Sequence, residues 1–129
     1  MEEKEWNDFI RFDGNANALR LLTHPFRGKR PGGFALTFTT LAGIVKYPFE
    51  STSASAQKFG FFQSEKETWK TIARELGIPV ISENPLTGYR HPLVFLVEAA
   101  DDICYQIMDV EDASRLGILD LEEARELFT

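Results

Sequence analysis

The hydrophobic and polar positions of this chain repeat mostly with the period of an α-helix. The longest such segment covers residues 91–116, where apolar residues recur every three or four positions. Gly117 is predicted to end it, because glycine readily adopts the backbone conformation that follows a helix. Shorter patterns predict helices over residues 15–22, 37–45, 64–76 and 121–128. The pattern therefore predicts an all-α fold.

Residues at the ends of these segments support the helix boundaries. Pro25 ends the helix over 15–22, since proline cannot continue a helix. Ser64 and Glu67 have the spacing of a capping box, which predicts that Ser64 caps the next helix. Gly77 is expected to end that helix, and Asp120 is expected to cap the last one.

The remaining segments are predicted as connections. Residues 27–33 form a basic, glycine-rich loop, residues 51–56 a short low-complexity linker, and residues 80–90 a further loop. The β-branched residues within 37–45 leave a strand as the alternative there. A short β-hairpin near 58–63 is the one expected addition to the helices. Residues 1–129 are taken together as a single helical segment.

A row of polar residues lies along one edge of the helix predicted over 91–116. At about 100° per residue, Asp101, Tyr105, Asp109 and Asp112 fall within less than a quarter-turn. The neighbouring sector is apolar and consists of Leu93, Leu96, Val97, Ala100, Cys104, Ile107 and Met108. A carboxylate at the border of a buried face can be held rigidly and still reach a substrate or metal. The alternative is a solvated acidic face on an ordinary amphipathic helix.

Composition narrows the class of protein. The chain has 129 residues and is 43% hydrophobic, enough for a folded core. It has no run of 18 apolar residues and no apolar leader, so we expect neither a membrane span nor a signal peptide. One cysteine fits a reducing, cytoplasmic location. The net charge of −6 argues against a general nucleic-acid binder.

Four ordered sequence blocks resemble a known family. They are Phe12–Arg20, Leu41–Pro48, Lys58–Glu65, and the block that begins at Arg90-His91-Pro92-Leu93 and continues through Asp101, Tyr105 and Asp109. Together they resemble the deoxyguanosine triphosphate triphosphohydrolases, which are dNTP triphosphohydrolases of the HD-domain superfamily. The resemblance runs from about Phe9 to about Leu119.

The resemblance implies a function for a parent enzyme. That enzyme would convert a dNTP, and dGTP in particular, to the deoxynucleoside and triphosphate, with a divalent cation such as Mg²⁺ or Mn²⁺. It implies a homo-oligomer, which is a hexamer in relatives, and single-stranded DNA is a regulatory partner in some relatives. No membrane partner is implied.

The resemblance also assigns roles to individual residues. Asp101 matches a metal ligand of the family, and Tyr105 and Asp109 match residues that contact the deoxyribose. Lys46, Tyr47 and Lys58 match positions that bind the substrate, where the lysines reach the triphosphate. A lysine at the end of an apolar helix otherwise extends into water, which is the alternative for Lys46.

Other parts of the family pattern are missing. The family site uses a His and a His-Asp pair, but His24 and His91 are the only histidines here and neither is followed by aspartate. His91 is expected to cap or pack instead. Asp13 stands where the family has a catalytic glutamate, and Asn17 replaces a glutamine. The chain therefore resembles the middle part of a longer enzyme, after the HD motif, with an incomplete metal site. The alternative is a non-catalytic dNTP-binding or assembly module.

Overall fold

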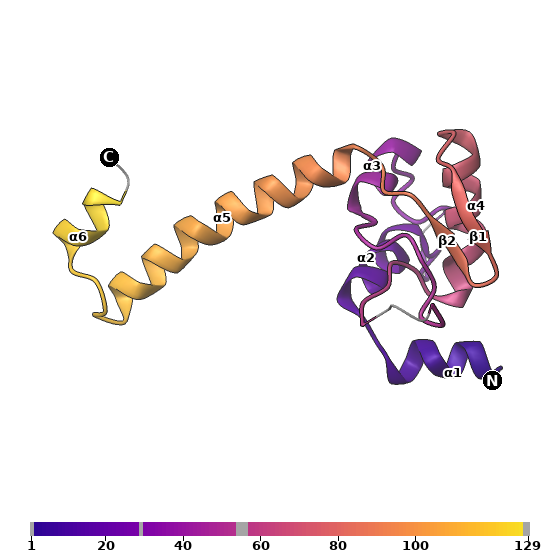
Figure 1. Ribbon diagram of the computed structural model, residues 1–129, viewed down its shortest axis with the longest axis horizontal. Helices are drawn as coiled ribbons and strands as arrows, with labels where there is room; N and C mark the ends of the chain where they lie inside the picture. Colours follow the sequence, from indigo (N-terminus) through magenta and orange to yellow (C-terminus); the bar gives the residue numbers. More distant parts are fainter. Residues whose placement is uncertain (1, 29, 54–56, 128–129) are drawn as a thin grey trace. The chain divides into compact units, whose positions relative to one another are not determined.

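The computed structural model describes residues 2–28, 30–53 and 57–127 (Figure 1). Lys29 of the expected basic loop, residues 54–56 of the expected linker and Phe128 of the last expected helix lie outside this part. Contacts along the chain divide it into two compact units, of which the first ends at Val94 and the second begins at Phe95.

The described residues are mostly helical, with one short antiparallel hairpin. The elements, in chain order, are α1 (Glu3–Ile10), α2 (Gly14–Thr23), α3 (Phe38–Ile44), the 3₁₀ turn η1 (Gln63–Glu65), α4 (Lys66–Glu75), β1 (Val80–Glu83), β2 (Leu86–Gly88), α5 (Leu93–Arg115) and α6 (Leu121–Glu126). This confirms the predicted all-α class. No helix within the described ranges has the length and apolarity that a membrane crossing needs.

The core of the first unit is assembled by three helices and the hairpin. Helix α3 contacts both α2 and α4, and η1 contacts α1, α2 and α4. The buried side chains of this core include Leu19, Leu41, Val45, Phe61, Trp69, Ile72 and Leu86. Because these residues come from five separate stretches of chain, the core fixes loops as well as helices.

The hairpin consists of β1 and β2 and therefore lies within residues 80–88. The prediction of a short hairpin was right, but its predicted position near 58–63 was wrong. The prediction of a loop throughout 80–90 was also wrong. Strands β1 and β2 pair antiparallel, with Glu83 opposite Leu86. Leu86 is fully buried in the core, and its backbone N–H donates to the buried carboxylate of Glu50 at 2.7 Å. These distant contacts, absent from any local pattern, hold the hairpin on the helices.

The expected capping box at Ser64 was also wrong. Residues Gln63–Glu65 form η1, and α4 follows without a side-chain cap. The Ser64 hydroxyl instead donates to the Glu65 carboxylate at 2.7 Å and lies 3.0 Å from a guanidinium nitrogen of Arg20, which donates to it. Arg20 also forms an ion pair with Glu65 at 2.8 Å. Arg20, which is distant in the sequence, thus binds Ser64, the residue predicted as the local cap, together with its neighbour Glu65.

The other helix predictions are confirmed to within a few residues. Thr37 caps α3 by accepting a hydrogen bond from the N–H of Thr40 at 3.2 Å, which rules out the strand alternative. Asp120 caps α6 in a capping box with Glu123. Gly117 follows α5 with φ of 70°. Helix α1 was not predicted, although its start carries a capping box between Glu2 and Glu5.

Candidate functional site

Three cationic side chains of the first unit surround the ring of Tyr47. The ammonium nitrogens of Lys46 and Lys58 lie 5.9 and 5.7 Å from the ring centroid. The guanidinium carbon of Arg90 lies 5.6 Å from the same centroid. The negative π face of an aromatic ring attracts cations at such distances. The structure thus gathers Lys46, Tyr47 and Lys58, three residues that the sequence assigns to substrate binding.

The approach of Lys58 to Tyr47 depends on a glycine. A Cβ atom on Gly60 would lie 2.1 Å from the Tyr47 carbonyl oxygen and 2.8 Å from a methyl carbon of Val45. The N–H of Gly60 donates to the Phe49 carbonyl oxygen at 3.2 Å. Only a residue without a side chain allows the two segments to run this close together. Lys58, two residues before Gly60, is thereby held beside the segment that carries Lys46.

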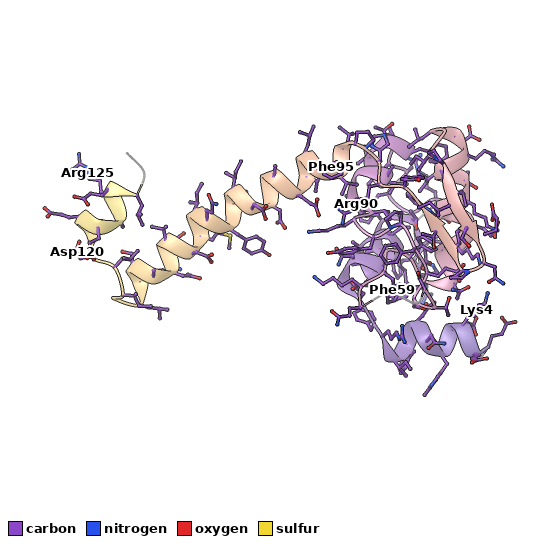
Figure 2. All side chains as sticks on the ribbon, viewed as in Figure 1. Lys4, Phe59, Arg90, Phe95, Asp120 and Arg125 are labelled. Carbon is purple, nitrogen blue, oxygen red and sulfur yellow. The ribbon has the colours of Figure 1, made fainter. Side chains whose placement is uncertain are left out.

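Sequence reasoning missed Arg90, although it lies in one of the four matching blocks. Its backbone is anchored to the Tyr47 segment, because the N–H of Gly88 donates to the carbonyl oxygen of Pro48 at 2.8 Å. Gly88 is the last residue of β2, so Arg90 follows two residues after the hairpin (Figure 2). The hairpin, which was not predicted at this position, thus places Arg90 near Tyr47. The signal that could have identified Arg90 is its position directly before His91.

His91 has the structural role that the sequence predicts. Its ring Nδ1 accepts a hydrogen bond from the N–H of Leu93 at 3.2 Å. Its carbonyl oxygen accepts from the N–H of Val94 at 3.0 Å. His91 therefore closes the start of α5, which confirms the capping interpretation.

Asp13 serves as the N-cap of α2. Its carboxylate accepts hydrogen bonds from the backbone N–H and the side-chain amide of Asn15, both at 2.7 Å. A cap of this kind satisfies a backbone donor that the first helical turn leaves unpaired. The catalytic role assigned to Asp13 remains a prediction.

Glu50 and Asp8 are two of the buried carboxyl groups of the first unit. Glu50 is fully buried and forms an ion pair with Lys66. Burial opposes ionisation of Glu50, but hydrogen bonds from Lys66, Gln63 and the N–H of Leu86 outweigh it, so the pKa of Glu50 is lowered. These bonds tie the segment after Tyr47 to α4 and the hairpin.

Asp8 shows the opposite balance. It is 7% exposed and accepts hydrogen bonds from the Ser51 hydroxyl at 2.5 Å and from the N–H of Gln63 at 2.6 Å. Burial raises its pKa in spite of these bonds. Asp8 therefore links α1 to the segments on either side of Lys58.

An open pocket of 560 Å³ lies beside α1, α2 and η1. Its walls combine apolar and polar side chains: Glu5, Asp8, Phe9, Phe12, Asn17, Arg20, Phe62, Gln63 and Ser64. Asn17, which replaces a family glutamine, is thus brought to a hollow. None of the residues predicted to bind substrate line this pocket.

The second unit carries the other predicted site residues on α5. Asp101, Tyr105 and Asp109 are exposed, and the Tyr105 side chain is 55% exposed. The apolar sector beside them, expected to be buried, is exposed as well; among its members are Leu96, Val97, Ala100, Cys104, Ile107 and Met108. An apolar surface of this extent is typical of a helix that packs against further protein. The resemblance implies that Asp101, Lys46 and Lys58 serve one substrate site. This stays a prediction, because Asp101 and the two lysines belong to different units.

The metal site implied by the resemblance does not fit the residues at hand. In the described ranges, no group of three His, Cys, Asp or Glu side chains is placed to hold a metal ion. A divalent cation in a protein generally needs several such ligands. Asp101 as a metal ligand therefore remains a prediction.

Comparison with known proteins relates the chain to one group of curated proteins. A deoxyguanosinetriphosphate triphosphohydrolase-like protein of Synechocystis is 45% identical over 124 residues, and one of Pseudomonas aeruginosa is 40% identical over 132 residues. The deoxyguanosinetriphosphate triphosphohydrolase of Cronobacter sakazakii is 32% identical over 125 residues. No family model matches the chain. Over most of its length, the chain is homologous to the deoxyguanosinetriphosphate triphosphohydrolases and proteins like them.

The matches are unequal in coverage. They include 87%, 98% and 90% of this chain for the Synechocystis, Pseudomonas and Cronobacter proteins, but only 28%, 29% and 22% of those proteins. The chain thus spans less than a third of the length of these curated relatives. Activities of the whole relatives pass to this chain only as proposals.

Proposed function

We propose that this chain is the phosphate- and sugar-binding part of a dNTP triphosphohydrolase. The parent protein would hydrolyse dGTP, or another dNTP, to the deoxynucleoside and triphosphate. The observation that carries the proposal is the convergence of Lys46 and Lys58 on the ring of Tyr47. These lysines come from two different sequence blocks, and both match triphosphate-binding positions of the family.

The electrostatics of the first unit support this role. A nucleoside triphosphate carries about four negative charges, which cationic side chains must compensate when water is displaced. The net charge of the chain is −6, so a local group of three positive side chains is opposite in sign to the chain as a whole. Attack of water on the α-phosphorus would place further negative charge on the departing triphosphate. Lys46 and Lys58 would stabilise that charge.

The second unit would supply the sugar contacts. Asp109 can accept a hydrogen bond from the 3′-hydroxyl of a deoxyribose, since a carboxylate is a strong acceptor. Tyr105 lies one helical turn before Asp109 and would pack its ring on the sugar. A ring in that place leaves no room for a 2′-oxygen, which would select deoxyribonucleotides.

We further propose that the chain corresponds to the middle of the parent enzyme, after its HD motif. The exposed apolar sector of α5 and the coverage of less than a third of each relative support this placement. Asp101 would then provide one carboxylate to a divalent metal, Mg²⁺ or Mn²⁺, whose other ligands lie elsewhere in the parent. Assembly into a homo-oligomer is part of the same proposal.

A non-catalytic dNTP-binding or assembly module is the second candidate. This candidate is favoured because the described residues include no group of three side chains that could hold a metal ion. The two candidates differ in turnover: the module would bind a dNTP without releasing triphosphate.

Release of triphosphate from dGTP by the full-length parent protein tests the proposal. We expect Lys46→Gln and Lys58→Gln each to lower kcat/KM by about 100-fold, the usual effect of removing one group that stabilises transition-state charge. Lys70→Gln is the matched control, because Lys70 pairs with Glu67 on the surface of α4. Binding of dGTP without turnover by the parent would favour the module. Equal activity of all three variants would refute the phosphate role.

A further inference from the structure

We propose that Arg90 is a third phosphate-binding residue, which acts with Lys46 and Lys58 on one polyphosphate. This inference rests on the proposed function and adds to it a residue without an assigned role. The guanidinium carbon of Arg90 lies closer to the Tyr47 ring centroid, at 5.6 Å, than either ammonium nitrogen does. Tyr47 is thus the common neighbour of three cations.

The three charges are close enough to act on one ligand. Each lies within 5.9 Å of the ring centroid, which is inside the screening length of ~8 Å at physiological salt. Their positive potentials therefore add in the space around the ring. A triphosphate offers oxygens along its whole length, whereas a single carboxylate or phosphate could meet only part of the group.

Backbone hydrogen bonds hold together the chain segments that carry the three cations. The Lys58 segment is tied to the Tyr47 segment by the bond from Gly60 N–H to Phe49 O at 3.2 Å. The Arg90 segment is joined to the same Tyr47 segment by the hydrogen bond from Gly88 N–H to Pro48 O at 2.8 Å. The cationic group is therefore set by the fold of the first unit before any ligand binds. Such preorganisation lowers the entropic cost of binding.

Arginine offers a geometry that the lysines lack. A guanidinium presents two parallel N–H donors to two oxygens of one phosphate, while an ammonium acts as a point charge. Arg90 is half-buried, so this fork is restricted in its orientation. We therefore assign Arg90 to a phosphate with two free oxygens, beside the contacts that Lys46 and Lys58 make.

Binding of inorganic tripolyphosphate to this chain tests the inference. Titration calorimetry would measure the Kd for the wild type and for Arg90→Gln, Lys46→Gln and Lys58→Gln. Arg74→Gln is the control, since it removes one positive charge from the exposed surface of α4. We expect Arg90→Gln to raise the Kd about 10-fold, as for loss of a charge-assisted hydrogen bond, and Arg74→Gln to leave it unchanged.

Arg90→Lys separates the fork from the charge. We expect it to restore part of the affinity that Arg90→Gln loses, and the circular dichroism of both variants should match the wild type. A Kd for Arg90→Gln equal to that for Arg74→Gln, while the two lysine variants bind weakly, would overturn the role of Arg90 and leave the proposed function intact. Absence of tripolyphosphate binding by the wild type would overturn both.

Discussion

Gly60 lies against the carbonyl group of Tyr47, so closely that a Cβ atom at position 60 would be 2.1 Å from the Tyr47 oxygen. The neighbour is backbone, which cannot rotate away as a long side chain could. The chain after Tyr47 and the chain before Phe61 can pass each other only because position 60 is glycine. This contact holds Lys58 beside the ring that also attracts Lys46 and Arg90.

We therefore expect Gly60→Ala to damage both stability and anion binding. Overpacking of this kind costs about 1–3 kcal/mol, and relief of the overlap requires the Lys58 segment to move away from Tyr47. Urea denaturation and the Kd for tripolyphosphate would measure the two effects. Gly14→Ala is the matched control, since nothing lies within 4 Å of a Cβ at Gly14. Wild-type stability and affinity in Gly60→Ala would contradict the close approach.

The ion pair between Glu50 and Lys66 should make stability depend on pH. A carboxyl whose pKa is lower in the folded state adds stability above its unfolded pKa and loses it as the pH falls through the folded pKa. For Glu50 this loss begins below its ordinary value of 4.5. Asp8 acts in the opposite sense, because its raised pKa penalises the ionised form and the penalty disappears at low pH.

Glu50→Gln tests this balance. Removal of one partner from a buried pair costs on the order of 3–5 kcal/mol, so we expect that loss in the free energy of unfolding at neutral pH. The further decline below pH 4.5 should be smaller in the variant than in the wild type. Chemical denaturation at neutral pH and at several acidic values would measure both, with the exposed Glu75→Gln as control. An unchanged acid decline would argue against the lowered pKa of Glu50.

The helices were predictable because their signals are local. Thr37 and Asp120 cap their helices through hydrogen bonds to residues two or three positions away, and Gly117 ends α5 by its own backbone conformation. Apolar spacing set the remaining boundaries. Helix α1 was not predicted, although the capping box between Glu2 and Glu5 at its start is an equally local signal.

The hairpin and the cation group were not predictable, because distant contacts determine them. Leu86 is held by the carboxylate of Glu50, which is 36 residues away along the chain. Arg90 meets Tyr47 through the bond between Gly88 and Pro48. Neither pairing leaves a periodic signal. The resemblance predicted the roles of Lys46 and Lys58. The proximity of Arg90 to Tyr47 depends on the position of the hairpin, so it could not be predicted from the sequence.

Ser64 provides a test of a distant contact against a local motif. As an N-cap, Ser64 would contribute about 1 kcal/mol, but its hydroxyl is exposed and α4 begins later, at Lys66. We therefore expect Ser64→Ala to lower the free energy of unfolding by only about 0.3 kcal/mol, well below the value for an N-cap. Glu65→Ala should cost about 1.5–3 kcal/mol, because Glu65 is 4% exposed and its carboxylate accepts charge-assisted hydrogen bonding from Arg20. Thermal unfolding of both variants would rank them, and an equal cost would restore the capping interpretation.

In the proposed function, Tyr105 and Asp109 determine how the parent enzyme selects the sugar. Asp109→Ala should lower kcat/KM for dGTP, because loss of the acceptor leaves the 3′-hydroxyl unpaired at a cost of about 1–3 kcal/mol. Tyr105→Phe keeps the ring that would exclude a 2′-oxygen, so discrimination against GTP should survive. Tyr105→Ala removes the ring and should relax that discrimination. Steady-state kinetics of the three variants with dGTP and GTP would decide. Rejection of GTP by Tyr105→Ala as strong as in the wild type would refute the steric role of Tyr105.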